Sequence, residues 1–122
     1  MKALMLKPEY VADIISGDKT VEYRSWPTNF RGDILLGCSA TRYARGYLAA
    51  IVEITDCQYD RVDGVYVWSI DNVRCIEPVP IIGKLRLFET GIQLSDVRII
   101  ETDDEINEAY DKAEEWLLKR KK

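Results

Sequence analysis

The sequence predicts an α+β domain in which about six short strands form a small curled sheet or barrel. Short apolar or alternating runs recur over the first hundred residues, between turns rich in glycine, proline and aspartate. One short helix is predicted after the first run, and the clearest helical periodicity closes the chain. With 122 residues, 47% hydrophobic and 31% charged, the sequence is expected to form a single domain over 1–122, with a core over about 2–100 and a C-terminal helix over about 103–120.

The first elements follow from local signals. Residues 2–7 are rich in Leu and Met and predict a buried strand. Pro8 suits the first turn of a helix over 8–16, which Gly17 can end in a left-handed conformation.

Two further strands are predicted before residue 40. Residues 20–24 alternate, with Val21 and Tyr23 on one face and the polar residues on the other; the polar set is Thr20, Glu22 and Arg24. Residues 33–39 are continuously apolar, which is typical of a strand buried on both faces.

Two long strands are predicted next, over 46–59 and 65–75, with a turn at 60–64. Pro78 and Pro80 confine the following segment to a sheet edge or a loop. We expect another short strand over 84–88 and a last apolar run over 97–100.

The C-terminal helix has the strongest signal. The sequence T-D-D-E is a capping box, with Thr102 as the cap and Glu105 three residues later. Its apolar face repeats at helical spacing and should pack on the sheet. The face comprises Ile106, Ala109, Tyr110, Ala113, Trp116 and Leu117.

Apolar runs such as 34–36 are far shorter than the ~20 residues of a membrane-spanning helix. The N-terminal M-K-A-L-M-L-K-P lacks the pattern of a signal peptide. We therefore expect a cytoplasmic protein that does not contact a membrane.

Histidine is absent, which excludes Ser-His-Asp and Cys-His catalysis and any histidine metal site. Cys38, Cys57 and Cys75 form no C-x-x-C motif, so neither a disulfide framework nor a zinc site is predicted. Each is expected to be a packed thiol on a strand. We predict no metal and no cofactor.

Charge is distributed unevenly. The net charge is -4, and residues 101–122 account for -3 of it, with eight acidic and five basic residues. Residues 19–46 carry five basic and two acidic side chains, a local charge of +3. Such a segment could contact phosphate groups although the protein is acidic overall.

The same basic segment carries a family resemblance. The stretches G-D-K-T-V-E-Y-R-S-W and R-G-D-I-L-L-G-C-S resemble the ASCH domain, a branch of the PUA-like superfamily. The order of further features, including K-P-E-Y, Y-V-W and P-V-P-I-I-G-K, extends the resemblance over about residues 2–88. It implies a PUA-like mixed β-barrel of about six strands with a cleft that binds RNA, a nucleotide or a modified nucleoside.

The resemblance also implies site residues. Lys19, Glu22 and Arg24 match the G-x-K-x-x-E-x-R motif, while Arg31 and Ser39 match positions around the next strand. Some ASCH proteins are hydrolases, among them deacetylases of N-acetylated cytidine that use a lysine, a threonine three residues later and a distant glutamate. Here Glu22 stands at the threonine position, which departs from that pattern. Ribonuclease activity also occurs in the family, but no motif here indicates it.

The chemistry of the motif favours binding. Arg24 and Lys19 could clamp a phosphate while Glu22 holds them in place, although an exposed ion pair would give the same pattern. A nearby carboxylate also favours a charged lysine, so the catalytic candidates Lys19 and Glu22 apply only if the protein is an enzyme.

Trp26 could stack a base or could instead close the end of the barrel. Three functions remain open: binding of RNA or a nucleotide in a basic cleft, hydrolysis of RNA or acylated nucleosides, and protein interaction through the acidic helix. The candidate ligand-binding residues are Lys19, Glu22, Arg24, Ser25, Trp26, Arg31, Ser39 and Arg42.

Overall fold

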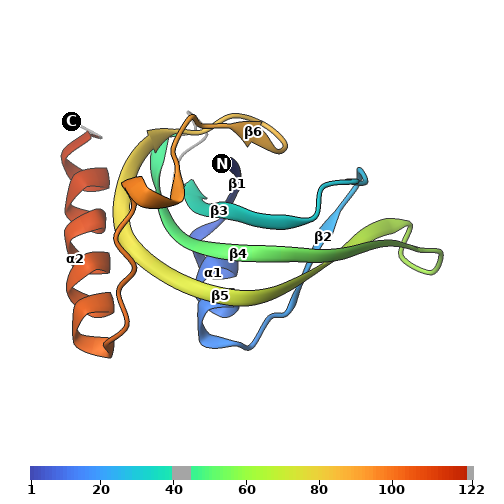
Figure 1. Ribbon diagram of the computed structural model, residues 1–122, viewed down its shortest axis with the longest axis horizontal. Coiled ribbons are helices and arrows are strands. Elements are labelled where there is room, and N and C mark those ends of the chain that lie inside the picture. Colours follow the sequence, from blue (N-terminus) through green and yellow to red (C-terminus); the bar gives the residue numbers. More distant parts are fainter. Residues whose placement is uncertain (40–44, 121–122) are drawn as a thin grey trace.

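The computed structural model describes residues 1–39 and 45–120 and shows six strands in one mixed sheet with two α-helices (Figure 1). The strand order is β2-β5-β4-β3-β1-β6, in which β1 and β3 are parallel and the other neighbours antiparallel. The elements are β1 (Lys2–Leu6), α1 (Pro8–Ser16), β2 (Val21–Arg24), β3 (Gly32–Ser39), β4 (Arg45–Asp60), β5 (Val65–Ile82), β6 (Phe88–Glu89), a 3₁₀ turn (Leu94–Asp96) and α2 (Asp103–Arg120).

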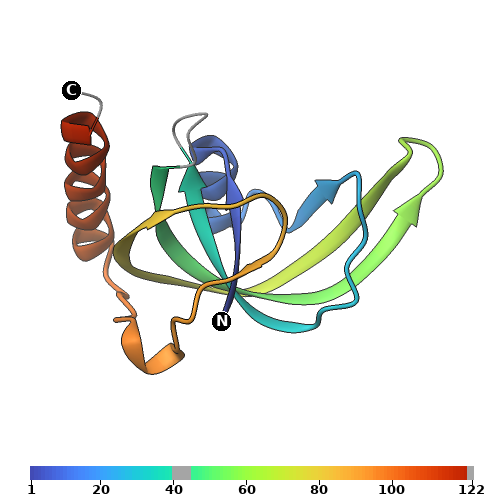
Figure 2. The same cartoon turned by 90° about the horizontal axis from the view of Figure 1, so that it is seen from above.

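The sheet is strongly curved but open within the described residues, so the predicted curled sheet is confirmed, whereas the closed barrel that the resemblance implied is not observed. β4 and β5 are long, and their pairing shifts register at three places, which bends the sheet (Figures 1 and 2). β2 and β6 lie at opposite edges of the strand order, and no pairing joins them within the described ranges. β6 has two residues and pairs with Lys2 and Ala3, so it is too short to bridge the two edges.

The predicted helix over 8–16 is confirmed as α1. Pro8 occupies its first turn, and Gly17 ends it with a φ of 86° while its N–H bonds the carbonyl of Ile14 at 3.2 Å. Val11 and Ile14 are buried, which fixes α1 against the sheet.

The strand expectations for residues 76–100 were partly wrong. Pro78 and Pro80 lie within β5, which runs on to Ile82. They are accommodated because β2 pairs with β5 over 66–69, so this part of β5 lies past β2, on a sheet edge as predicted.

The strand predicted over 84–88 is also wrong in its extent. Arg86 has a φ of 62°, a left-handed conformation that interrupts an extended segment, and β6 begins at Phe88. The run over 97–100 contributes an isolated bridge between Ile99 and Ile76. The 3₁₀ turn at Leu94–Asp96, just before this run, was not predicted from the sequence.

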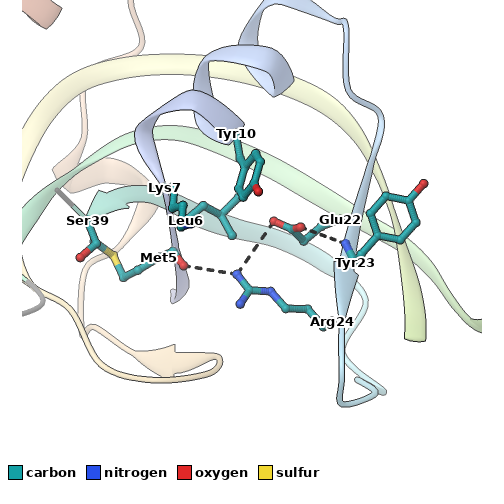
Figure 3. A pocket seen from close by; sticks show the side chains of 8 residues that line it. All are labelled: Met5, Leu6, Lys7, Tyr10, Glu22, Tyr23, Arg24 and Ser39. Atoms are coloured by element: carbon teal, nitrogen blue, oxygen red, sulfur yellow. Dashed lines mark hydrogen bonds and ion pairs between the residues drawn. The ribbon is translucent and has the colours of Figure 1, made fainter. Parts of the chain in front are cut away.

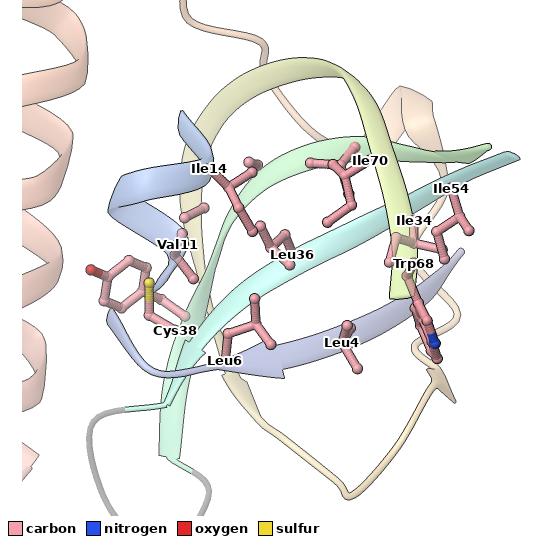
Figure 4. Close-up of a cluster of buried hydrophobic side chains, with 14 of the residues drawn as sticks. Leu4, Leu6, Val11, Ile14, Ile34, Leu36, Cys38, Ile54, Trp68 and Ile70 are labelled. Carbon is pink, nitrogen blue, oxygen red and sulfur yellow. The ribbon is translucent and has the colours of Figure 1, made fainter. Parts of the chain in front are cut away.

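Apolar side chains fill both faces of the sheet, as Figure 4 shows for the inner face. Ile34, Leu36 and Cys38 of β3 enter the inner cluster, while Leu35 enters the cluster on the opposite face. The prediction that residues 33–39 are buried on both faces is therefore confirmed.

The C-terminal helix α2 begins where the capping pattern predicts. The N–H of Glu105 donates to Oγ1 of Thr102 at 3.2 Å. Ala113 is buried, and Tyr110 meets Tyr47 edge to face at 6.5 Å between ring centroids. The side chains of Trp116 and Leu117 lie outside the described ones. α2 stands at the end of the molecule opposite the β4–β5 hairpin tip (Figures 1 and 2). No helix among the described residues is long and apolar enough to cross a membrane.

Burial makes Cys38 a poor nucleophile, which gives a first prediction. Loss of hydration raises the pKa of its thiol to about 11, although a hydrogen bond with Tyr47 lowers it in part. Since the thiolate is the reactive form, about 0.1% of this thiol is ionised at pH 8. We expect alkylation of native Cys38 by iodoacetamide to be negligible at pH 8, as measured by peptide mass spectrometry, whereas the urea-unfolded chain reacts at Cys38. Rapid labelling of native Cys38 would contradict its burial.

Candidate functional site

A pocket of about 320 Å³ lies between β1, α1 and β2 (Figure 3). It occupies the open side of the sheet, between edge strand β2 and the part of β1 that β6 does not pair with. The pocket therefore exists because no strand pairing joins β2 to β1. Its lining residues are Met5, Leu6, Lys7, Tyr10, Glu22, Tyr23, Arg24 and Ser39.

Glu22 is the centre of this pocket. It is 4% exposed and is the one buried charged residue among those that the structure describes. Strand alternation turns Glu22 inward and leaves Tyr23 52% exposed. Oε1 of Glu22 accepts hydrogen bonds from Nζ of Lys19 at 3.3 Å and from the N–H of Tyr23 at 2.9 Å. The alternative of an exposed ion pair is thus wrong for Glu22.

Arg24 links the two sides of the opening. Its Nη2 donates to the carbonyl of Met5 on β1 at 3.3 Å and lies 3.9 Å from Oε2 of Glu22 (Figure 3). Backbone groups on free strand edges need partners, and this arginine supplies one. Arg24 therefore connects β2 to β1 where no strand pairing does.

Lys19 lies at the rim of the pocket among aromatic rings. Its Nζ is 4.4 Å from the ring centroid of Tyr10 and 5.7 Å from that of Tyr23. Its backbone N–H donates to the carbonyl of Asp13 at 3.0 Å, which anchors the turn to α1. The ammonium is thus held by one carboxylate and two ring faces.

Two polar atoms in this cluster have no hydrogen-bond partner. Oε2 of Glu22 and Nε of Arg24 are both buried and unsatisfied. Buried polar groups are almost always hydrogen-bonded, and here the described residues supply no partner for these two atoms. The cluster can accept one hydrogen bond and donate another.

The comparison with known families places this geometry. The model of the ASCH domain matches residues 4–82, which include every residue that lines the pocket. The chain belongs to the ASCH domain family. No curated protein matches the chain at a significant level. β6 and α2 follow the matched segment of this ASCH domain.

The residues that the resemblance assigned to the site fall into two groups in space. Glu22, Arg24 and Ser39 line the pocket, and Lys19 contacts Glu22 from the rim. Arg31 lies outside the lining: it donates to the carbonyl of Phe30 at 2.8 Å and pairs with Asp56 at 3.8 Å.

Two other candidates also lie outside the lining, and a third cannot be placed. Trp26 packs edge-on against Trp68 with centroids 4.7 Å apart, and the guanidinium of Arg86 lies 5.3 Å from its ring centroid. Ser25 is exposed and does not line the pocket. Arg42 is outside the described residues.

Five of the eight residues that line the pocket were not predicted as site residues from the sequence. Met5 and Leu6 come from the end of β1, Lys7 precedes α1, Tyr10 lies in α1, and Tyr23 lies in β2. Nothing in the sequence of β1 distinguishes it from a core strand. The signal that could have been used is the K-P-E-Y stretch of the resemblance, which contains both Lys7 and Tyr10. The structure leaves Tyr10 41% exposed.

A second, smaller pocket of about 140 Å³ lies under α2. Arg98 crosses its rim, pairing with Glu77 at 3.1 Å and with Glu105 at 3.5 Å. These groups satisfy one another at the surface. Across the described part of the chain, no group of three or more side chains is arranged to bind a metal.

Proposed function

We propose that this ASCH domain binds RNA or a nucleotide in the pocket between β1, α1 and β2. The family is generally thought to bind RNA. The observation that carries the proposal for this chain is the buried Glu22 with Arg24 and Lys19 around it, on the open side of the curved sheet. Burial of a charged side chain costs free energy, and such side chains are concentrated at functional sites.

Local charge supports a polyanionic ligand. Lys7 is exposed and lines the pocket, so the pocket and its rim hold three basic side chains, Lys7, Lys19 and Arg24, and one carboxylate, Glu22. This excess lies in a chain whose net charge is -4. A local positive field of this kind concentrates a phosphate backbone at one place while the rest of the protein repels it.

Aromatic surface is available beside the charges. Tyr10 and Tyr23 are both exposed and both line the pocket. Stacking of a base on such a ring contributes about 1–3 kcal/mol and tolerates any sequence. Trp26, which the sequence offered for this task, is engaged by Trp68 and Arg86.

Arginine substitution tests the proposal. We expect Arg24→Ala to weaken binding of a fluorescein-labelled single-stranded RNA about tenfold, measured by fluorescence anisotropy, because it removes a charge and a fork of donors. Arg31→Ala is the matched control: it removes the same charge, directly before β3 and outside the pocket. It should change affinity less than about twofold.

Two outcomes would contradict this function. Equal losses in both variants would place the RNA outside the pocket. Turnover of RNA or of acylated nucleosides by the native protein, abolished in Glu22→Gln, would instead make the chain a hydrolase, with Glu22 as acid or base.

A further inference from the structure

We propose that the part of the ligand held by Glu22 and Arg24 is the neutral edge of a nucleobase, and that the phosphate lies elsewhere. This inference rests on the proposed function and specifies the ligand chemistry at the same pocket. It follows from what the two unsatisfied atoms can accept and donate.

The two oxygens of the Glu22 carboxylate differ in their hydrogen bonds. Oε1 already accepts from Lys19 and from the N–H of Tyr23, at 3.3 and 2.9 Å. Oε2 accepts no hydrogen bond from the described residues, and Nη2 of Arg24 lies 3.9 Å from it. A ligand group that pairs with Oε2 must therefore be a hydrogen-bond donor.

Arg24 has the opposite requirement, because one of its donors lacks an acceptor. Its Nη2 is used by the carbonyl of Met5 at 3.3 Å, while its Nε–H is buried without an acceptor. The two side chains are on the same face of β2, two residues apart. A ligand that fills both places must offer an acceptor and a donor close together.

Two kinds of nucleotide group offer both an acceptor and a donor: a ribose hydroxyl, through a single oxygen, and the edge of a nucleobase, through two neighbouring atoms that match the two separate side chains. A phosphate offers acceptors alone at neutral pH and would bring negative charge against the buried Glu22. A cation offers donors alone and would meet Lys19 and Arg24. The edge of a nucleobase carries a ring nitrogen or carbonyl next to an N–H, and carboxylate and guanidinium groups are established readers of such edges.

Access to the two atoms needs a small movement of Arg24. Both atoms are covered in this conformation. The guanidinium is held by one 3.3 Å hydrogen bond and a 3.9 Å ion pair, and the arginine side chain is 26% exposed. These contacts are long for a charged pair, so the side chain can swing aside when a base enters.

Titration with nucleosides and with phosphate compounds distinguishes binding of a base edge from binding of a phosphate. The amide signals of the ¹⁵N-labelled full chain are followed by NMR during titration with a mixture of the four nucleosides, and separately with ribose 5-phosphate and with inorganic pyrophosphate. We expect shifts of the amides of 5–7 and 22–24 with the nucleosides only. Arg24→Lys, which keeps the charge but loses Nε, should weaken nucleoside binding at least about fivefold.

Each result decides the matter. Shifts at 5–7 and 22–24 with ribose 5-phosphate or pyrophosphate, and not with nucleosides, would overturn the inference and leave RNA binding intact. No shift with any of the three would also overturn it, because a bridging water then satisfies both atoms. Nucleoside binding without RNA binding in the anisotropy assay would refute the proposed function and retain the inference.

Discussion

Replacing Trp68 with alanine is expected to lower the free energy of unfolding by about 3–5 kcal/mol, the range for removing a large aromatic side chain from a core. Trp68 is 0% exposed and meets Trp26 edge to face at 4.7 Å. Its Nε1 also donates to the carbonyl of Trp26 at 3.3 Å. Because Trp68 lies opposite Glu22 in the β2–β5 pairing, the loss should loosen β2 as well as the core. Urea denaturation followed by circular dichroism measures the change.

Matched variants show whether the effect belongs to this position. Trp68→Phe keeps an aromatic ring and should cost about 1–2 kcal/mol, because it removes less volume. Val62→Ala, at a residue that is 92% exposed on the hairpin tip, should have almost no effect. A loss below about 1 kcal/mol for Trp68→Ala would mean that β2 is not fixed through this residue.

The second large effect is expected at Glu22. Glu22→Leu leaves Lys19 and Arg24 without their shared carboxylate, and we expect a loss of about 2–3 kcal/mol. The value is below that of a fully buried pair because the side chains of Lys19 and Arg24 are 18% and 26% exposed and can reach water. Thermal and urea unfolding at pH 7 measure it, and the circular dichroism of the folded state shows whether β2 remains paired.

A triple variant separates charge from packing. Lys19→Met, Glu22→Leu and Arg24→Met together remove all three charges, so no cation is left unpaired. This variant should recover most of the stability that Glu22→Leu loses, but it should not bind RNA, because it lacks Arg24 and Lys19. A triple variant as unstable as the single one would show that the shape of Glu22, and not its charge balance, holds the opening together.

Local chemistry predicted the elements with strong signals. The Pro8 and Gly17 boundaries of α1 and the Thr102 cap of α2 were foreseen because each depends on a few neighbouring residues. Segments governed by distant contacts were not. Pro78 indicated an edge or a loop but could not show that β5 continues through it, since that depends on how far β2 extends beside β5.

The sequence predicted the charged motif residues of the site but not most of its other walls. Lys19, Glu22 and Arg24 were identified from a motif, and the structure brings them together. The burial of Glu22 could not be predicted, because alternation does not say which face of a strand is inward. Met5 was beyond prediction too, since its role is a backbone carbonyl exposed by the open sheet. Arg31 is near in sequence but faces Asp56, outside the pocket.

The most direct test of the account maps where RNA contacts the protein. A short single-stranded RNA is titrated into the ¹⁵N-labelled full chain, and amide shifts are followed by NMR. The account predicts the largest shifts around the pocket, in the segments 5–10, 19–24 and 39. Shifts concentrated on α2 and the groove beneath it, lined by Glu77, Arg98 and Glu105, or no shifts at all, would contradict the claim that the open side of the sheet is the RNA site.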